Sequence, residues 1–259
     1  MTEVEFNNLS DFELAHIFEC GQCFRWHKEE DNSYTGVTQF GVMNVKKIKE
    51  TSDKSYKIMI RGNFLSEDQD VIKSQLSNYF DLEMDYEKVK ANIEKDDQNM
   101  KKAIEFGYGI RILNQDPWEM LISFIISAAN NIPRISKTIE NIAKAYGKRI
   151  VFEERDYYLF PTALELSKAK VEDLRDLNLG FRDKYVYEAT KKVATGEICL
   201  EKIEKMDYQS AKKELMKIGG IGEKVADCIL LFSMKKREAF PVDTWIKKVM
   251  EELYLESRN

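Results

Sequence analysis

A glycine-rich turn between two helical segments constrains this chain more than any other feature. Residues 209–218 and 223–234 show helical periodicity, and Gly219, Gly220 and Gly222 stand between them. Glycine adopts positive φ angles and lets another group approach the backbone closely. The amides that begin the second helix point outward at the positive end of its dipole, an arrangement that suits a phosphate. The pattern predicts a helix-hairpin-helix that grips a nucleic acid backbone. On the glycines alone, a tight turn between two helices without a ligand is an equally good interpretation.

A lysine and an aspartate add chemistry to this turn. Lys224 stands in the first turn of the second helix, where the helix dipole favours the neutral amine that a nucleophile needs. The helix from Lys224 to Met234 rises ~15 Å, and residues 235–242 can span up to ~26 Å if extended. The chain can therefore return Asp243 to the side of Lys224, where a carboxylate could stabilise a developing cation and assist proton transfer. A solvent-exposed lysine and an aspartate that only caps a helix are the alternatives without chemistry.

The first part of the chain alternates polar and apolar residues. Residues 33–49 and 55–62 have the period of two that is typical of half-buried strands. Residues 66–69 read Ser-Glu-Asp-Gln, a capping box that predicts a helix through about Phe80. Two more short helices are expected within residues 85–106. This region therefore predicts an antiparallel sheet with accompanying helices.

The periodicity is helical from Asp116 onward. Asp116 is a good N-cap with Pro117 at the first helical position, and residues 118–129 are apolar nearly all round, so this helix should be buried. Further helices are expected at about residues 133–146, 162–167, 171–177, 183–195, 209–218, 223–234 and 243–255. We predict an α+β fold, with an antiparallel sheet domain over residues 1–112 and an all-helical domain over residues 113–259 that contains the helix-hairpin-helix at about 209–234.

The charge distribution is uneven. The net charge of −5 argues against a simple nucleic-acid binder, and residues 1–20 carry five acidic residues and no Lys or Arg. Residues 209–250, in contrast, carry nine Lys or Arg against five Asp or Glu. An acidic body with a basic working face can still bind a polyanion, although a local imbalance of this size is also common on solvated surfaces.

Composition excludes several classes of protein. No apolar run approaches the ~18–20 residues that a membrane span needs, and no basic region of a secretory signal precedes the first apolar patch. The cysteines are too few for a disulfide framework, and two histidines argue against a histidine-built metal centre. These residues are Cys20, Cys23, Cys199, Cys228, His16 and His27. Free thiols are expected, with Cys20 and Cys23 as buried small residues that flank a turn.

Several short motifs, in order along the chain, resemble the 8-oxoguanine DNA glycosylase family of the helix-hairpin-helix (HhH-GPD) DNA glycosylase superfamily. They run from about residue 6 to residue 250 and so cover nearly the whole chain. Besides the hairpin with Lys224 and the sequence Pro241-Val242-Asp243, they are Gly21-Gln22-Cys23-Phe24-Arg25-Trp26, Gln115-Asp116-Pro117, Asn130-Asn131-Ile132-Pro133-Arg134-Ile135 and Leu179-Gly180-Phe181-Arg182. Each motif alone is weak evidence for the family, and the motifs together, in the family's order, are strong evidence.

The resemblance implies a bifunctional enzyme. Lys224 would attack C1′ of the sugar as the base leaves and form a Schiff base, which supports both base removal and strand cleavage. Asp243 would be its electrostatic and acid–base partner, and Cys228 would line the base pocket. The main-chain carbonyl of Gly21 would accept a hydrogen bond from N7–H of the damaged base. Only the oxidised base has a hydrogen on N7, so one carbonyl can discriminate against normal guanine.

The resemblance also implies contacts to DNA. Arg134 and Arg182 would read the orphaned cytosine, and Phe181 would enter the base stack, whereas without the family a core aromatic is the simpler interpretation of Phe181. The remaining implied positions form three groups. They are Asn130 and Asn131 on the opposite strand, Gly220 and Gly222 at the DNA backbone, and the carbonyls of Met216, Ile218 and Ile221 at a structural monovalent cation. No other cofactor is expected, and no cysteine follows Cys228 to hold an iron–sulfur cluster.

Two departures from the family pattern stand out. Ala129 replaces the first of three asparagines, the residue that normally fills the space left by the extruded base. The chain also stops 16 residues after Asp243, before the further helix that closes the base pocket in the family. Either the sequence is part of a longer chain or that wall of the pocket is missing.

The function that these expectations favour is removal of 8-oxoguanine from duplex DNA by base flipping, with apurinic-site lyase activity. The expected protein is a monomer in the cytoplasm or at the nucleoid, with no membrane partner. An alkylated-base glycosylase of the same superfamily and a non-catalytic helix-hairpin-helix DNA-binding protein are the alternatives.

Overall fold

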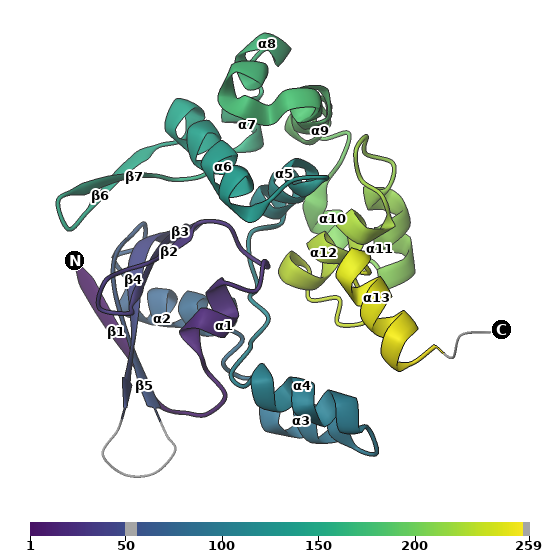
Figure 1. Ribbon diagram of the computed structural model, residues 1–259. Helices are drawn as coiled ribbons and strands as arrows, with labels where there is room; N and C mark the ends of the chain where they lie inside the picture. The colour runs from purple at the N-terminus through teal and green to yellow at the C-terminus, as the bar shows by residue number, and fades with distance from the viewer. Residues whose placement is uncertain (50–55, 256–259) are drawn as a thin grey trace.

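An antiparallel sheet forms the N-terminal part of the computed structural model, which describes residues 1–49 and 56–255 (Figure 1). In the described residues the sheet has the strand order β1-β5-β4-β3-β2. The strands are β1 (Thr2–Leu9), β2 (Trp26–Lys28), β3 (Tyr34–Thr38), β4 (Gly41–Lys49) and β5 (Tyr56–Phe64). The predicted strand region 33–49 is thus a hairpin of two strands, and β5 matches the second predicted strand except for residue 55, which lies outside the described residues. The alternation did not reveal β1 and β2.

One face of the sheet builds a hydrophobic core. Val4 pairs with Ile60, and Ile60 pairs with Val45 on the next strand, so these buried side chains lie side by side. The helices α1 (Leu14–Phe18) and α2 (Gln69–Tyr79) contribute further residues to this core. The N-cap of α2 is Asp68, whose carboxylate accepts from the amides of Asp70 and Val71. The capping box predicted from Ser66 is therefore wrong by two residues, because the shorter Ser66 side chain instead accepts from the amide of Asp68.

Two short helices project from the rest of the molecule. They are α3 (Tyr86–Glu94) and α4 (Gln98–Phe106), as expected within residues 85–106, and none of their residues is buried. Figure 1 shows them apart from both the sheet and the main group of helices.

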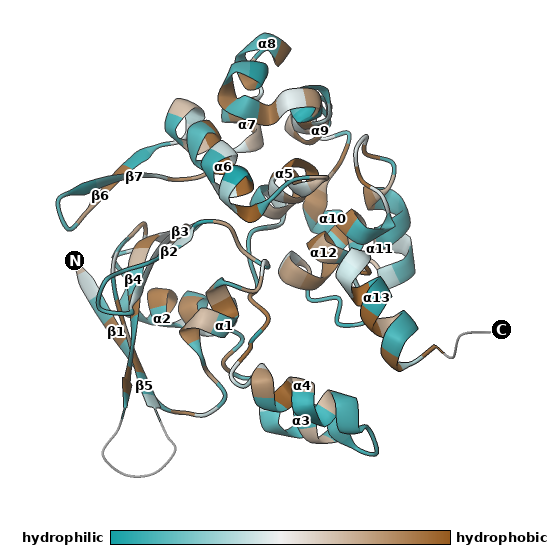
Figure 2. Ribbon diagram, in the orientation of Figure 1, coloured by the Kyte–Doolittle hydropathy of each residue, from teal (hydrophilic) through white to brown (hydrophobic). Residues whose placement is uncertain are grey.

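The C-terminal part is built around one buried helix, α5 (Pro117–Ser127). The Asp116 carboxylate caps it by accepting from the amide of Glu119 at 2.7 Å, as the sequence indicates. The other helices are α6 (Ile132–Tyr146), α7 (Ala163–Leu166), α8 (Val171–Leu174), α9 (Asp183–Ala194), α10 (Leu200–Glu204), α11 (Tyr208–Leu215), α12 (Glu223–Ser233) and α13 (Thr244–Leu253), with irregular helical turns over 175–182. Figure 2 shows the hydrophobic colour on α12, which packs against α5. No helix in the described ranges combines the length and hydropathy needed to cross a membrane.

A two-stranded ribbon interrupts the helices, and the sequence did not reveal it. Strands β6 (Arg149–Phe152) and β7 (Arg155–Tyr158) are joined by Glu153 and Glu154, which both have positive φ. Glycine and asparagine are the usual residues at such turn positions, so two glutamates give no turn signal. The ribbon reaches the sheet, where the Asn63 side chain donates to the Val151 carbonyl at 2.9 Å.

Candidate active site

The hairpin between α11 and α12 presents an open helix N-terminus. Gly220 has a φ of 84°, and a Cβ at this position would lie 2.9 Å from the Tyr185 ring, so the protein itself requires this glycine. Gly222 differs, because its φ is −94° and a Cβ there would meet nothing within 4 Å. Gly222 is the N-cap of α12 and has no side chain to cover the first amides of the helix. The space in front of these amides is therefore open to an external anion.

An ion pair with a buried carboxylate links the two hairpin helices. The Lys212 ammonium on α11 lies 2.9 Å from the Asp227 carboxylate on α12, and the Tyr208 hydroxyl donates to the same carboxylate at 2.8 Å. Asp227 is buried, so all three groups are held in one arrangement.

Lys224 lies in the first turn of α12 and faces α5. Its Nζ atom is 5.6 Å from the centre of the Phe124 ring, a cation–π distance. Cys228 follows one helical turn later and is buried. Burial raises the pKa of Cys228 to about 11, although the Lys224 charge acts in the opposite direction, and the Asp243 carboxylate adds to the rise. The Cys228 thiol is therefore protonated at neutral pH, and both Lys224 and Asp243 lie close enough to act on it.

Asp243 caps the helix that follows. Its Oδ1 atom accepts from the amides of Trp245 and Ile246 at 3.0 and 2.8 Å. Asp243 also lines the same cleft as Lys224, so the chain does return as the reach of residues 235–242 allows. The cleft has a volume of about 530 Å³, and its lining residues are Ser127, Ala128, Ala129, Asn130, Lys224, Val225, Val242, Asp243, Thr244 and Lys247.

The opposite wall of the cleft is the turn between α5 and α6. Ala129 has a φ of 49°, a left-handed conformation that is uncommon outside glycine, asparagine and aspartate. The Asn130 side chain donates to the Ile126 carbonyl at 3.1 Å, and the Asn131 side chain caps α6 by accepting from the Arg134 amide. Both asparagines thus hold this turn by hydrogen bonds to the backbone.

The two arginines expected at the orphaned base lie in different environments. Arg134 is exposed, whereas Arg182 is buried and its guanidinium donates to the carbonyls of Ala128 and Ala129. Phe181 is 63% exposed, with the Arg182 guanidinium 4.3 Å from its ring centre. Phe181 is therefore not a core aromatic, and Arg182 links the turn that carries Phe181 to the cleft wall.

Gly21 lies outside the set of residues that line this cleft. Its φ is 85°, and a Cβ there would lie 3.8 Å from the Ile132 side chain at the start of α6. Nearby, Cys23 is buried as expected, but Cys20 is exposed, so the expectation that both are buried is wrong for Cys20. Cys20 comes just after the short helix α1, at the point where the chain turns at the surface.

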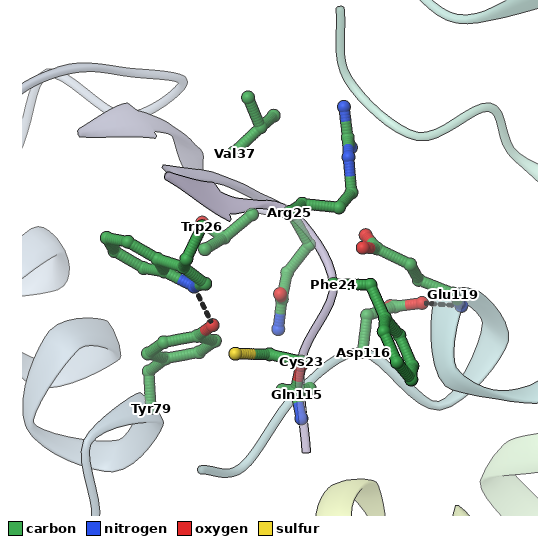
Figure 3. A pocket seen from close by; sticks show the side chains of 11 residues that line it. Cys23, Phe24, Arg25, Trp26, Val37, Tyr79, Gln115, Asp116 and Glu119 are labelled. Atoms are coloured by element: carbon green, nitrogen blue, oxygen red, sulfur yellow. Dashed lines mark hydrogen bonds between the residues drawn. The ribbon is translucent and has the colours of Figure 1, made fainter. Parts of the chain in front are cut away.

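A second, much smaller pocket lies between the sheet and the helices (Figure 3). It holds about 10 Å³, space for roughly one water molecule. Figure 3 shows Arg25 and Glu119 among its lining residues. Arg25 forms an ion pair with Glu140 at 2.7 Å, and burial raises the pKa of Glu119 to about 7 although the Arg25 charge opposes the rise. Arg25 belongs to the motif of residues 21–26, but nothing in the local sequence marks Glu119 as buried beside it.

The hairpin carbonyls suggested for a monovalent cation lie between α11 and α12. The Ile218 carbonyl accepts from the Ile221 amide at 3.2 Å and retains a second lone pair. Carbonyl oxygens are suitable donors for a hard cation, so the donor set of Met216, Ile218 and Ile221 fits such an ion. Within residues 1–49 and 56–255, no group of three or more His, Cys, Asp or Glu residues could hold a metal ion.

Two family models together match nearly the whole chain. Residues 6–121 match the family model "8-oxoguanine DNA glycosylase, N-terminal domain", and residues 122–259 match "HhH-GPD superfamily base excision DNA repair protein". The chain is 32% identical to a "Probable N-glycosylase/DNA lyase" of Methanothermobacter thermautotrophicus, over 72% of this chain and 65% of the relative. It is 31% identical to an "N-glycosylase/DNA lyase" of Saccharomyces cerevisiae, over 97% of this chain and 71% of the relative. The chain thus spans about two thirds of the length of these relatives.

A solved structure gives a close structural match. The Clostridium acetobutylicum 8-oxoguanine glycosylase/lyase, in complex with double-stranded DNA containing cytosine opposite 8-oxoguanine, superposes with a TM-score of 0.90 at 40% identity. The match covers 100% of this chain and 88% of that chain.

Proposed function

We infer the function from one premise: the chain belongs to the HhH-GPD superfamily of base excision DNA repair proteins and, within it, to the 8-oxoguanine DNA glycosylases. We propose that it removes 8-oxoguanine from duplex DNA and cleaves the strand at the resulting site. Its proposed partner is double-stranded DNA that contains 8-oxoguanine, bound by a monomer at the nucleoid or in the cytoplasm.

The observation that carries the proposal is the cleft that Lys224 and Asp243 share. An amine and a carboxylate nineteen residues apart in sequence line one cleft of about 530 Å³. The cleft lies beside the open N-terminus of α12, where a DNA phosphate can be bound. A nucleotide turned out of the helix would therefore meet a nucleophile and a charge-stabilising group together.

The proposed chemistry has two stages, base removal and strand cleavage. As the C1′–N9 bond breaks, the electron pair leaves with the base, which takes up a proton. Lys224 Nζ then bonds to C1′ and loses a proton, while the Asp243 carboxylate stabilises the positive charge that develops on the sugar. The C1′–O4′ bond then breaks, O4′ takes up a proton, and a Schiff base forms between Nζ and C1′. Loss of a proton from C2′ then breaks the C3′–O bond and releases the 3′ side of the strand.

Recognition of the base is proposed for Gly21 and Cys228. The Gly21 carbonyl would accept from N7–H of 8-oxoguanine and would face a second acceptor in guanine. The Cys228 thiol, protonated because burial raises its pKa to about 11, would offer a neutral wall to the base.

The DNA contacts fall on both sides of the cleft. The amides behind Gly222 would bind a phosphate, and a monovalent cation held by the carbonyls of Met216, Ile218 and Ile221 would add positive charge there. The exposed Phe181 ring would fill the gap in the stack. Exposed Arg134 would pair with the orphaned cytosine, with Arg182 beside it.

Borohydride trapping tests the proposal. A duplex with 8-oxoguanine opposite cytosine should give a covalent adduct with the wild-type protein, and an undamaged duplex should not. Lys224→Gln should retain DNA binding and lose both trapping and strand cleavage. A panel that includes an alkylated-base duplex separates the alternatives. Excision of the alkylated base without any adduct would favour the alkylated-base glycosylase, and binding without excision would favour the non-catalytic module.

A further inference from the structure

The helix that carries Asp243 is poorly anchored by its own packing. None of the residues 244–253 of α13 is buried, and Trp245 in its first turn is 71% exposed. The Asp243 carboxylate is oriented by the two amides that it caps. The far end of α13 has one further contact, in which the Tyr254 hydroxyl donates to the Asp97 carboxylate at 2.9 Å. At the end that carries Asp243, the chain segment that leads to it is the main support.

That segment, residues 235–239, is held at several points. The Lys236 amide donates to the Leu230 carbonyl on α12 and the Ala239 amide to the Lys236 carbonyl, both at 3.1 Å, and Ala239 is buried. Beyond it, Phe240 and Val242 are exposed. Residues 235–239 are thus the last well-held part of the chain before Asp243.

Two side chains of this segment reach across to the N-terminal domain. The Arg237 guanidinium lies 2.8 Å from the Asp81 carboxylate, and the Lys235 ammonium donates to the Asn78 side chain at 2.5 Å. Asn78 lies in the last turn of α2 and Asp81 just after it. The partners are 156 and 157 residues apart in sequence, so these contacts join the two domains.

Asp81 is a well-supported anchor. Its carboxylate also accepts from the Tyr86 hydroxyl at 2.8 Å and from the Asn114 side chain at 3.3 Å. Its main-chain carbonyl accepts from the Arg111 guanidinium at 2.8 Å. The Asp81 side chain is only 13% exposed, so the pair with Arg237 is better shielded than a surface ion pair.

We propose that Arg237 is a positioning residue for the proposed excision reaction. Through Asp81 it fixes the segment that ends in Asp243 to the N-terminal domain, and so holds the Asp243 carboxylate opposite Lys224. The N-terminal domain thereby contributes to catalytic geometry without contributing a group to the chemistry. The expected effect on the excision rate rests on the proposed function. The expected hold on residues 235–239 rests on the contacts alone.

The test compares Arg237→Met with Lys236→Met, which removes the same charge from the neighbouring position. Arg237→Met should lower the single-turnover rate of 8-oxoguanine excision by about tenfold to a hundredfold, because small displacements of a catalytic group are costly. Affinity for undamaged duplex should match that of Lys236→Met within about twofold, and Arg237→Lys should restore part of the rate. Equal excision rates for Arg237→Met and Lys236→Met would overturn the proposal.

A double-mutant cycle adds the partner. If Arg237 acts through Asp81, Arg237→Met combined with Asp81→Asn should excise no more slowly than the slower single variant, whereas multiplied losses would show independent roles and overturn the proposal.

Amide hydrogen exchange gives a readout that needs no activity. Residues 239–246 should exchange faster in Arg237→Met than in Lys236→Met, and equal exchange would contradict the inference. A wild-type protein that excises no 8-oxoguanine would refute the proposed function instead, and the exchange measurement would still decide whether Arg237 holds this segment.

Discussion

Helices α12 and α13 carry the two halves of the proposed catalytic pair in opposite environments. α12 packs against α5, and most of its residues after Lys224 are buried, whereas α13 after Asp243 has no buried residue. The proposed nucleophile is therefore carried by a helix that packs into the core. The proposed partner carboxylate is held by its own helix cap and, as we propose, by the contact between Arg237 and Asp81. The difference teaches that one half of this site is positioned by packing and the other by polar contacts.

The largest expected effect comes from the carboxylate itself. Asp243→Asn should lower the single-turnover excision rate by about a hundredfold or more, because the lost charge acts mainly in the transition state. Asparagine is also a good N-cap, so the melting temperature should change little. An unchanged rate would mean that Asp243 only caps α13, and the contrast between the two helices would then have no catalytic meaning.

The ion pair between the hairpin helices α11 and α12 tests how far packing on the Lys224 side contributes to stability. Asp227→Ala leaves Lys212 without its carboxylate and should lower the free energy of unfolding by about 2–3 kcal/mol. Denaturant unfolding measures this loss, with Asp243→Asn as the matched comparison, for which under about 0.5 kcal/mol is expected. Similar losses in the two variants would contradict the difference in anchoring.

Glu119 is a buried carboxyl on α5, the helix against which α12 packs, so the pH dependence of stability reports on the packed side of the comparison. The pKa of Glu119 is about 7 in the folded protein against 4.5 as its ordinary value. A raised pKa means that the contribution of Glu119 to stability is fully present below pH 4.5 and is lost as the pH rises through 7. The free energy of unfolding of Glu119→Gln, relative to that of the wild type, should therefore be higher at pH 8 than at pH 5, by at most about 3 kcal/mol. Thermal unfolding at the two pH values measures this, and a stabilisation that does not grow with pH would refute it.

The smallest effect is expected at the open end of α12. Gly222→Ala should leave the melting temperature nearly unchanged, because a Cβ there meets nothing within 4 Å, and it should weaken duplex binding by a few fold. Gly220→Ala is the matched control, since its positive φ and the Tyr185 ring should make that change destabilising. Undiminished duplex binding by Gly222→Ala would argue that no phosphate approaches this glycine.

Much of the fold was predictable from local sequence signals. The glycines of the hairpin, the Asp116 cap with Pro117, and the alternation within β5 all act within a few residues, and the elements they predicted are present. The ribbon β6–β7 was missed because two glutamates occupy its positive-φ turn. The helix α10 was missed because its five residues are too few to show a helical period.

The site was predictable where neighbours in sequence define it and not where the fold brings distant residues together. Chain reach allows Asp243 to return towards Lys224, the family resemblance pairs the two residues, and both line one cleft in the structure. The burial of Arg182 against the carbonyls of Ala128 and Ala129 depends on how two separate turns pack. The contact between Arg237 and Asp81 joins two domains, and no local pattern marks either residue as a partner of the other.

The most direct test of the account is to map the residue that is trapped. The wild-type protein is reduced with borohydride on a duplex with 8-oxoguanine opposite cytosine, digested, and sequenced by mass spectrometry. The account predicts a sugar adduct on the peptide that contains Lys224, at the Lys224 side chain. An adduct at the N-terminal amine or at another lysine, or no adduct despite excision of the base, would contradict the assignment of Lys224 as the nucleophile of this cleft.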